Sequence, residues 1–366
     1  MLAWAAGNIH RFLSPRDSSM LELTEATAAE ALFQSGRIGS ADGTRVRELS
    51  GGVSNVVLLV EESGQRYVVK QARGKLRVQA DWQCSIERIW REVEVLEASR
   101  SLLGAKANEL PEILWVDRPL YAYAMTAAPA NSLTWKEQLL AGSCSPDIAS
   151  RCGEILGQLH AQSWHDAAIS EQFDDRTYFR ELRLEPYYSQ AAKNYPALAK
   201  PLEVLIDQTW QQRHALVHGD FSPKNLLVSS DTRTLQIMLI DFEVGHFGDP
   251  AFDLGFFLTH LTLKVIHLPQ HSANILQLIK AFWQTYARRM QATLSKLELQ
   301  ELEQRTAMNL AGCLVARVHG KSPVDYLTAN DKQAAVQLSE RLFALGEQAT
   351  WPAVGAQLNA VAVARE

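Results

Sequence analysis

The chain has 366 residues, of which 47% are hydrophobic and 21% are charged. This length can bury a large core and favours two domains over one. A net charge of −5 argues against a nucleic-acid partner, and no stretch approaches the roughly 20 apolar residues of a membrane span. The first residues lack a basic region and a convincing cleavage site, so we expect a cytoplasmic protein. The four cysteines are not at ligand spacing, and we expect them to be free thiols.

The N-terminal part begins with residues 1–47, which we expect to form an extension with one helix from Glu25 to Phe33. Two strands follow, from Leu49 to Val60 and from Arg66 to Gln71. The first contains the glycine-rich sequence GGVSN, and the second carries Lys70. Glycines let backbone amides approach phosphate oxygens, and hydroxyl or amide side chains add donors. Glycine pairs are more often turns, so GGVSN indicates a phosphate site only together with Lys70. The proposed donors are Gly51, Gly52, Ser54 and Asn55.

A helix is predicted from Ser85 to Leu103, because apolar residues recur there at helical spacing. Four glutamates lie in this segment, and Glu92 is next to the apolar face. The other three, Glu87, Glu94 and Glu97, are better explained as a solvated charged face. Glu92 is therefore the glutamate that we expect to point inward.

The middle of the chain contains a predicted strand from Leu120 to Thr126 and then a helix that starts at Ser145-Pro146-Asp147. That helix has an apolar stripe at Ile148, Cys152, Ile155, Leu156 and Leu159. His160 and His165 follow it, and we interpret both as structural rather than catalytic. Further helices are predicted from Asn274 to Met290 and from Lys296 to Val318.

The most informative segment is LVHGDFSPKNLLV. Asp220 follows the apolar strand Ala215–Val217, and Pro223 is expected to prevent a helix, so that a tight loop leads to Asn225. Such a loop can direct both side chains to one phosphate. A carboxylate can accept the proton of an attacking hydroxyl, and an amide oxygen can bind a metal.

A second predicted strand, Leu235 to Ile240, ends directly before Asp241. Glu243 lies two residues further on. Hard oxygen ligands of this kind suit magnesium. The motif HxDxxxxN, followed by an apolar hairpin and an aspartate, strongly indicates phosphoryl transfer. The tripeptide HGD alone could occur by chance.

These motifs resemble the aminoglycoside phosphotransferase and choline kinase superfamily, small-molecule kinases with the protein-kinase-like fold. The resemblance implies an α+β fold with a small β-rich N-lobe, residues 48–127, and a larger, mainly helical C-lobe, residues 128–366. It implies that Asp220 is the catalytic base and that Asn225, Asp241 and, near a second metal, Glu243 bind magnesium. It also implies that Lys70 pairs with the nucleotide phosphates and with Glu92. The hinge would be Met125, Thr126 and Ala127. The adenine would lie between Val57, Val68, Leu227 and Ile240, although apolar residues of this kind are also typical of any buried strand.

Part of the N-terminal half, VVKQARGKLRV with ERIWREVEVL, is also similar to 5-methylthioribose kinase, a branch of the same superfamily. The loop HGDFSPKN is the common superfamily form, because it retains Asn225. Acceptor residues are expected in the C-lobe, where each is individually more often an ordinary surface or packing residue. They are Tyr178, Arg180, Arg183, Glu185, Tyr187, Arg317 and His319.

The sequence therefore predicts an ATP- and magnesium-dependent kinase for the hydroxyl of a small molecule, by in-line transfer. An aminoglycoside, an amino alcohol and a sugar derivative all stay open, and the mixed charges after Asp253 fit a neutral or modestly charged alcohol at least as well as a cationic one. The sequence is also compatible with a homodimer. One alternative is a catalytically silent nucleotide-binding regulator. Another is a protein kinase, which would show a longer segment after Asp241.

Overall fold

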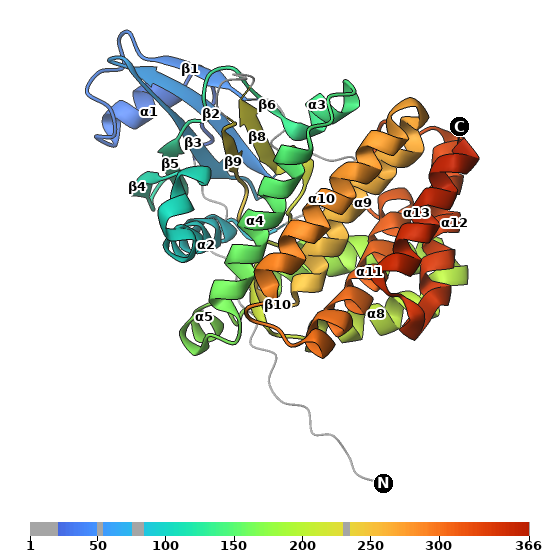
Figure 1. Ribbon diagram of the computed structural model, residues 1–366. Helices are drawn as coiled ribbons and strands as arrows, with labels where there is room; N and C mark the ends of the chain where they lie inside the picture. Colours follow the sequence, from blue (N-terminus) through green and yellow to red (C-terminus); the bar gives the residue numbers. More distant parts are fainter. Residues whose placement is uncertain (1–20, 50–53, 75–83, 230–234, 366) are drawn as a thin grey trace.

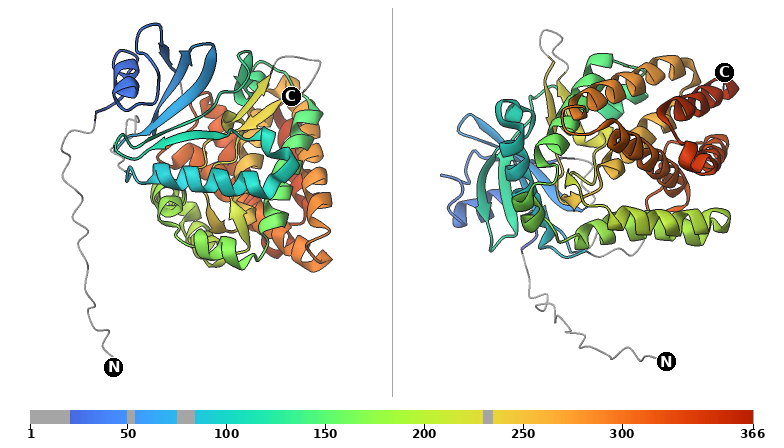
Figure 2. Two further views of the ribbon diagram at one scale, coloured as in Figure 1. Left: turned by 90° about the vertical axis from the view of Figure 1, so that its left-hand side faces the viewer. Right: turned by 60° about the horizontal axis from the view of Figure 1, so that its bottom comes forward.

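The computed structural model describes residues 21–49, 54–74, 84–229 and 235–365. A five-stranded antiparallel sheet lies beside a larger helical part, and the views in Figures 1 and 2 show the two side by side. The expected α+β fold with a β-rich first part and a helical second part is confirmed. The sheet order is β1-β2-β3-β5-β4, with the strands β1 (Arg45–Glu48), β2 (Asn55–Glu62), β3 (Gln65–Ala72), β4 (Ile113–Asp117) and β5 (Ala122–Thr126).

Alternation along the strands gives the sheet two apolar faces. On one face, Val56, Leu58 and Val60 pack with buried residues of α1 (Ala28–Gln34). On the other face, Leu59 and Val68 pack with α2 (Arg88–Leu103). The described part of the predicted extension thus supplies α1 and most of β1 to the sheet layer. Helix α1 starts later than predicted, because residues 24–27 form a turn in which the Thr24 and Thr27 hydroxyls accept backbone hydrogen bonds.

The helical part is built around α4 (Pro146–Ser163), α9 (Pro250–His267), α10 (Ser272–Met290) and α11 (Lys296–His319), with α4 packed on α10 and α9 packed on α11. Every residue of the predicted stripe on α4 is buried. His160 lies between the Tyr286 hydroxyl, at 3.0 Å, and the Asp253 carboxylate, at 3.3 Å, as expected for a structural histidine. The other helices are α3 (Trp135–Leu140), α5 (Ala167–Gln172), α6 (Thr177–Phe179), α7 (Gln190–Asn194), α8 (Ala199–Gln211), α12 (Ala329–Leu345) and α13 (Trp351–Arg365).

Short strands at the junction of the two parts carry the loop residues of the sequence motifs. Strands β6 (Ser132–Thr134), β8 (Leu226–Ser229) and β9 (Ile237–Leu239) form one small sheet, and β7 (Ala215–Val217) pairs with β10 (His246–Gly248). The predicted hairpin after Asn225 is therefore present, with a shorter second strand. All four cysteines are free.

Among the described residues, no single helix is long and apolar enough to cross a membrane. The pair formed by α9 and the segment Pro269–Met290 passes the length and composition criteria only together, and it is bent by 115°.

Candidate active site

Lys70 lies on β3, in the middle of the sheet, opposite Val57 on one side and Tyr123 on the other. Its ammonium is 2.5 Å from Oε1 of Glu92 and 3.0 Å from Oδ1 of Asp241. Burial lowers the pKa of Lys70, but the carboxylates of Asp241 and Glu92 outweigh it and raise the pKa well above its usual value. Lys70 therefore stays charged and links the sheet to the segment after β9.

Glu92 projects from α2 and is almost fully buried. Its Oε1 also accepts the backbone N–H of Phe242 at 3.3 Å, and Oε2 is a buried atom without a hydrogen-bond partner among the described residues. Burial raises the pKa of Glu92 to about 7, against the opposing effect of Lys70. The charge of Glu92 thus depends on its lysine partner.

The loop after β7 has a fixed backbone. Asp253 on α9 accepts the N–H of His218 at 2.7 Å and that of Gly219 at 2.8 Å. Gly219 has φ +75°, and a Cβ there would lie 2.9 Å from the carbonyl oxygen of Val244. Only glycine suits this position. Asp253 therefore supports the loop directly, whereas Asp249 caps α9 and contacts Arg305 at 3.1 Å.

Asp220 and Asn225 contact each other directly. The amide nitrogen of Asn225 donates to the carbonyl oxygen of Asp220 at 2.9 Å and to its Oδ2 at 2.8 Å. Contrary to the expectation that Pro223 prevents any helix, residues Pro223–Asn225 form a single 3₁₀ turn. Proline is tolerated there because the first N–H of a helical turn has no intrahelical partner.

Two cations flank Asp220. Nη2 of Arg183 lies 2.9 Å from Oδ1, and Nζ of Lys224 lies 2.9 Å from Oδ2. Burial raises the pKa of Asp220, but Arg183 and Lys224 outweigh it and lower the pKa below its usual value. Arg183 is one of the predicted acceptor residues, whereas Lys224 is not among the residues predicted from the sequence. The sequence feature that could have indicated Lys224 is its position four residues after Asp220 in the same loop.

Arg183 belongs to a π-helix, Arg180–Ser189, which the sequence did not predict. Such segments are rare and often occur at functional sites. Nε of Arg183 donates to the carbonyl oxygen of Gly219 at 2.9 Å, and its side chain is almost fully buried. The π-helix therefore holds Arg183 against both the backbone and the carboxylate of the loop.

Asp241 adopts φ +76°, a conformation that costs free energy for a residue with a side chain and is concentrated at functional sites. The backbone N–H of Ile240 donates to the carbonyl oxygen of Asn225 at 3.0 Å, which brings the ends of the two segments together. Burial raises the pKa of Asp241, and the charges of Lys70 and Lys224 lower it far more. Asp241 is thus an ionised carboxylate between the two lysines.

Glu243 lies near Asp241 and Glu92, and one oxygen of each of the three lies within 4.8 Å of the others. Its Oε2 accepts hydrogen bonds from Nε of Arg88 and from Nδ2 of Asn55, both at 3.1 Å. Arg88 is fully buried and was not identified from the sequence. The carboxylate oxygens, with the amide oxygen of Asn225, have the hard-donor chemistry that magnesium requires.

Of the predicted nucleotide residues, Gly51 and Gly52 lie outside the described residues. The carbonyl oxygen of Ser54 accepts a hydrogen bond from Arg88. Asn55 is directed to Glu243, so its role toward a phosphate stays a prediction. Two of the remaining apolar or hinge residues, Val68 and Met125, are buried, and the others are partly exposed, namely Val57, Thr126, Ala127, Leu227 and Ile240.

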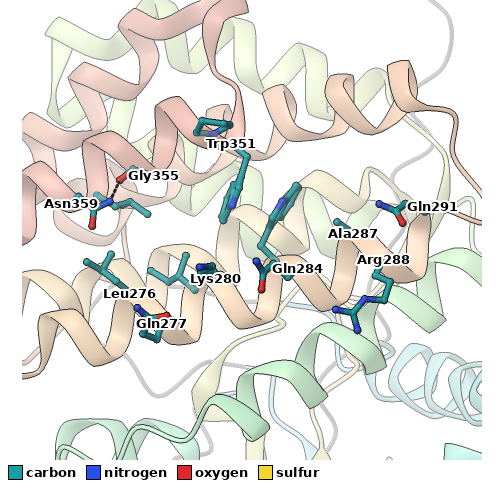
Figure 3. A pocket seen from close by; sticks show the side chains of 14 residues that line it. Leu276, Gln277, Lys280, Gln284, Ala287, Arg288, Gln291, Trp351, Gly355 and Asn359 are labelled. Atoms are coloured by element: carbon teal, nitrogen blue, oxygen red, sulfur yellow. Dashed lines mark hydrogen bonds between the residues drawn. The ribbon is translucent and has the colours of Figure 1, made fainter.

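A separate pocket of about 810 Å³ lies between α10 and α13 (Figure 3). Apolar and polar side chains line it, including Leu276, Lys280, Trp351 and Asn359. None of its lining residues is a carboxylate, and none belongs to the predicted site. The pocket is therefore separate from the carboxylates and lysines of the candidate active site.

Comparison with known proteins agrees with these motifs. The model of the phosphotransferase enzyme family matches residues 45–268. Methylthioribose kinase of Escherichia coli O45:K1 (strain S88 / ExPEC) is 25% identical over 290 residues, which are 68% of this chain and 67% of that one. Methylthioribose kinase 2 of Oryza sativa subsp. japonica is 23% identical over 301 residues, 74% of this chain and 68% of that one. The chain therefore spans about two thirds of the length of these relatives.

Solved structures show the same fold at lower identity. A microcompartment-associated aminopropanol kinase has a TM-score of 0.53 at 18% identity, with coverage of 91% of this chain and 99% of that one. Plasmodium vivax ethanolamine kinase has a TM-score of 0.52 at 13% identity, with coverage of 85% and 86%. The protein-kinase-like fold is thereby confirmed.

Proposed function

This chain belongs to the phosphotransferase enzyme family and is a small-molecule kinase, and from that premise we propose that it moves the γ-phosphate of ATP to a hydroxyl of its acceptor. The observation that carries the proposal is the meeting of two pairs of residues, Lys70 with Asp241 and Asp220 with Asn225, at the junction of the sheet and the helical part. Phosphoryl transfer depends on positioning and charge stabilisation, and these four side chains provide both.

In the proposed reaction, the acceptor oxygen forms a bond to the γ-phosphorus while the bond from that phosphorus to the ADP oxygen breaks. Asp220 orients the acceptor hydroxyl and accepts its proton. Its lowered pKa keeps it ionised at neutral pH, and Arg183 and Lys224 hold the carboxylate in place. Lys70 binds the nucleotide phosphates from the sheet side, since Glu92 fixes its ammonium.

Asp241 and Asn225 would hold magnesium, with Glu243 as a ligand of a second ion. Magnesium, when bound, neutralises charge on the transferring phosphate. Glu243 is already held by Arg88 and Asn55 through one oxygen, so that its other oxygen is the one proposed for a metal. The positive φ of Asp241 is consistent with a carboxylate held in a required direction.

A methylthioribose-kinase-like sugar kinase is the second form of this proposal. It is favoured by relatives of that name at 23–25% identity over more than two thirds of this chain. A catalytically silent regulator is disfavoured, because the proposed base, lysine and metal ligands are all present and in contact.

The test is a coupled assay of nucleotide consumption over hydroxylated metabolites, methylthioribose, amino alcohols and aminoglycosides. We expect acceptor-dependent ADP formation that is lost in Asp220→Asn, which retains the shape of the side chain. Asp207→Asn, at an exposed position of α8, is the matched control. Acceptor-dependent turnover that is equal in wild type and Asp220→Asn would refute the proposed role of Asp220.

A further inference from the structure

Three cations gather on the helical side of the catalytic loop. Lys136 lies on α3, Lys264 on α9 and Arg317 on α11, and we call them the cationic cluster. Nζ of Lys136 lies 5.7 Å, and Nζ of Lys264 5.5 Å, from the centre of the Tyr326 ring. Helix α11 packs against α9, and the charge of Arg317 acts on Lys264, so three helices that are distant in the sequence bring like charges together.

Lys264 is fully buried, and its ammonium donates one hydrogen bond, to the carbonyl oxygen of His260 at 3.1 Å. Within the described parts of the chain it has no carboxylate partner. Burial, together with the charges of Lys136 and Arg317, lowers the pKa of Lys264 to about 7. A buried cation of this kind is costly unless a negative group neutralises it.

Three buried polar atoms in or beside the cationic cluster have no hydrogen-bond partner among the described residues. These buried atoms are Nε of Arg317, the hydroxyl of Tyr326 and Nε2 of His260. His260 itself is only 8% exposed. Buried polar groups in native proteins are normally hydrogen-bonded, so these three atoms give this region hydrogen-bonding capacity that no described residue uses.

The cationic cluster is connected to Asp220 through Tyr187. Nη1 of Arg317 donates to the Tyr187 hydroxyl at 3.0 Å, and the guanidinium carbons of Arg317 and Arg183 both lie 5.7 Å from the centre of the Tyr187 ring. Arg183 in turn contacts Asp220. Helix α3, which carries Lys136, also packs against the 3₁₀ turn of the loop.

Electrostatics on His260 show the same proximity. Burial lowers its pKa well below the usual value, and the charges of Arg317, Lys264 and Lys224 lower it further. Lys224 is the loop residue that contacts Asp220. His260 is therefore within electrostatic reach of both the cationic cluster and Lys224 of the catalytic loop.

The negative charge available within the described residues is small. Lys136 lies 3.7 Å from Asp325, whose side chain is 83% exposed, and an ion pair that exposed neutralises little. Asp331, the next acidic residue, is occupied by His267 and Arg365. Nη1 of Arg317 already donates to Ser322 and Tyr187. An anion at the cationic cluster would instead meet the free Nε of Arg317 and the ammonium of Lys264, with which no described carboxylate forms an ion pair.

We propose that the acceptor is an anionic alcohol, whose hydroxyl faces Asp220 while a carboxylate or phosphate elsewhere in the molecule binds Arg317, Lys136 and Lys264. The inference rests on the proposed function and names its substrate class. It separates this kinase from one that phosphorylates cationic aminoglycosides or amino alcohols, and from one that acts on a neutral sugar such as methylthioribose. Charge-assisted hydrogen bonds to the anionic group would provide the selectivity.

The experiment measures acceptor binding, independently of turnover, by calorimetry on the full chain saturated with magnesium and a non-hydrolysable ATP analogue. The first set compares glycerate and glycerol 3-phosphate with neutral glycerol, the second compares gluconate with neutral glucose, and the third compares homoserine, which carries a carboxylate, with ethanolamine, which does not. Methylthioribose and kanamycin are the neutral and the cationic reference acceptors. We expect at least one carboxylate or phosphate probe to bind about 10-fold or more tightly than its neutral or cationic match. The carboxylate and phosphate arms distinguish the two sources of the anion.

Variants identify the binding groups. Arg317→Gln and Lys136→Gln should each weaken binding of the anionic probe about 10-fold, and Lys280→Gln, an exposed lysine on α10, should leave it unchanged. Tightest binding by a neutral or cationic probe would overturn the inference, as would undiminished affinity in both cluster variants. Turnover of such a probe that requires Asp220 would still support the proposed function, so the two failures can be told apart.

Lys264→Met is a second test, because it removes the buried charge but keeps the volume. If Lys264 binds the anionic group of the acceptor, the variant should bind the anionic probe about 10-fold more weakly, while its melting temperature does not fall. Unchanged affinity for the anionic probe in Lys264→Met would contradict the role assigned to this residue.

Discussion

Nη2 of Arg183 lies 2.9 Å from Oδ1 of Asp220, and both side chains are almost completely buried. The guanidinium comes from a π-helix and the carboxylate from the loop after β7, so the contact joins two separate elements. Nε of the same guanidinium binds the carbonyl oxygen of Gly219. Arg183 therefore fixes both the charge and the position of the proposed base.

Replacement of Arg183 by Gln should lower kcat about 10- to 100-fold, because small displacements of a positioned group are costly. It should also change the pH profile. Arg183 lowers the pKa of Asp220, so its removal raises that pKa and moves the acid limb of kcat/KM to higher pH. The profile is measured with the acceptor found by the screen. Lys200→Gln, at an exposed position of α8, should keep the wild-type profile.

Lys70→Met should destabilise the fold as well as abolish nucleotide-phosphate contact. The substitution leaves Glu92 buried without its cation, a change that typically costs about 3 kcal/mol or more. The double variant Lys70→Met/Glu92→Leu should recover much of this loss in denaturant unfolding, but not catalysis. If the double variant is no more stable than Lys70→Met alone, the buried pair is not the cause.

Asp253→Ala should cost about 2–4 kcal/mol, because the N–H groups of His218 and Gly219 lose their acceptor inside the protein. The contribution should depend on pH. The folded pKa of Asp253 is lowered, through His160 and His218 against the effect of burial, so its stabilisation is present above the ordinary aspartate pKa and is lost as the pH falls through the folded value. Unfolding free energies at pH 7 and pH 3 measure this. A difference between variant and wild type that grows on acidification would contradict the assignment.

Local sequence patterns predicted much of the fold. The apolar stripe on α4 and the spans of α10 and α11 follow from helical periodicity, and each is present as predicted except for small shifts at the ends. The stretch from His218 to Asp241 was informative for another reason. Its functional residues lie close together in the sequence, on a loop and a hairpin whose geometry is decided locally.

Contacts between distant segments could not be predicted in this way. Arg183, which contacts Asp220, lies in a π-helix, whereas the sequence around Pro186 shows no more than an interruption. The sequence shows Arg88 only as one more charge on an amphipathic helix, although its buried guanidinium binds Glu243 and four carbonyl oxygens. The cationic cluster likewise depends on the packing of three helices, which periodicity does not determine.

The most direct measurement is the affinity for Mn²⁺ with a non-hydrolysable ATP analogue, followed by electron paramagnetic resonance. Mn²⁺ accepts the same oxygen ligands as magnesium and gives a signal without turnover. If Asp241 and Asn225 hold the metal and Lys70 binds the phosphates, Asp241→Asn, Asn225→Ala and Lys70→Met should each weaken the complex about 10-fold or more, whereas Asp220→Asn should bind nearly as wild type. Wild-type affinity in Asp241→Asn would contradict the proposed metal site and, with it, the proposed kinase mechanism.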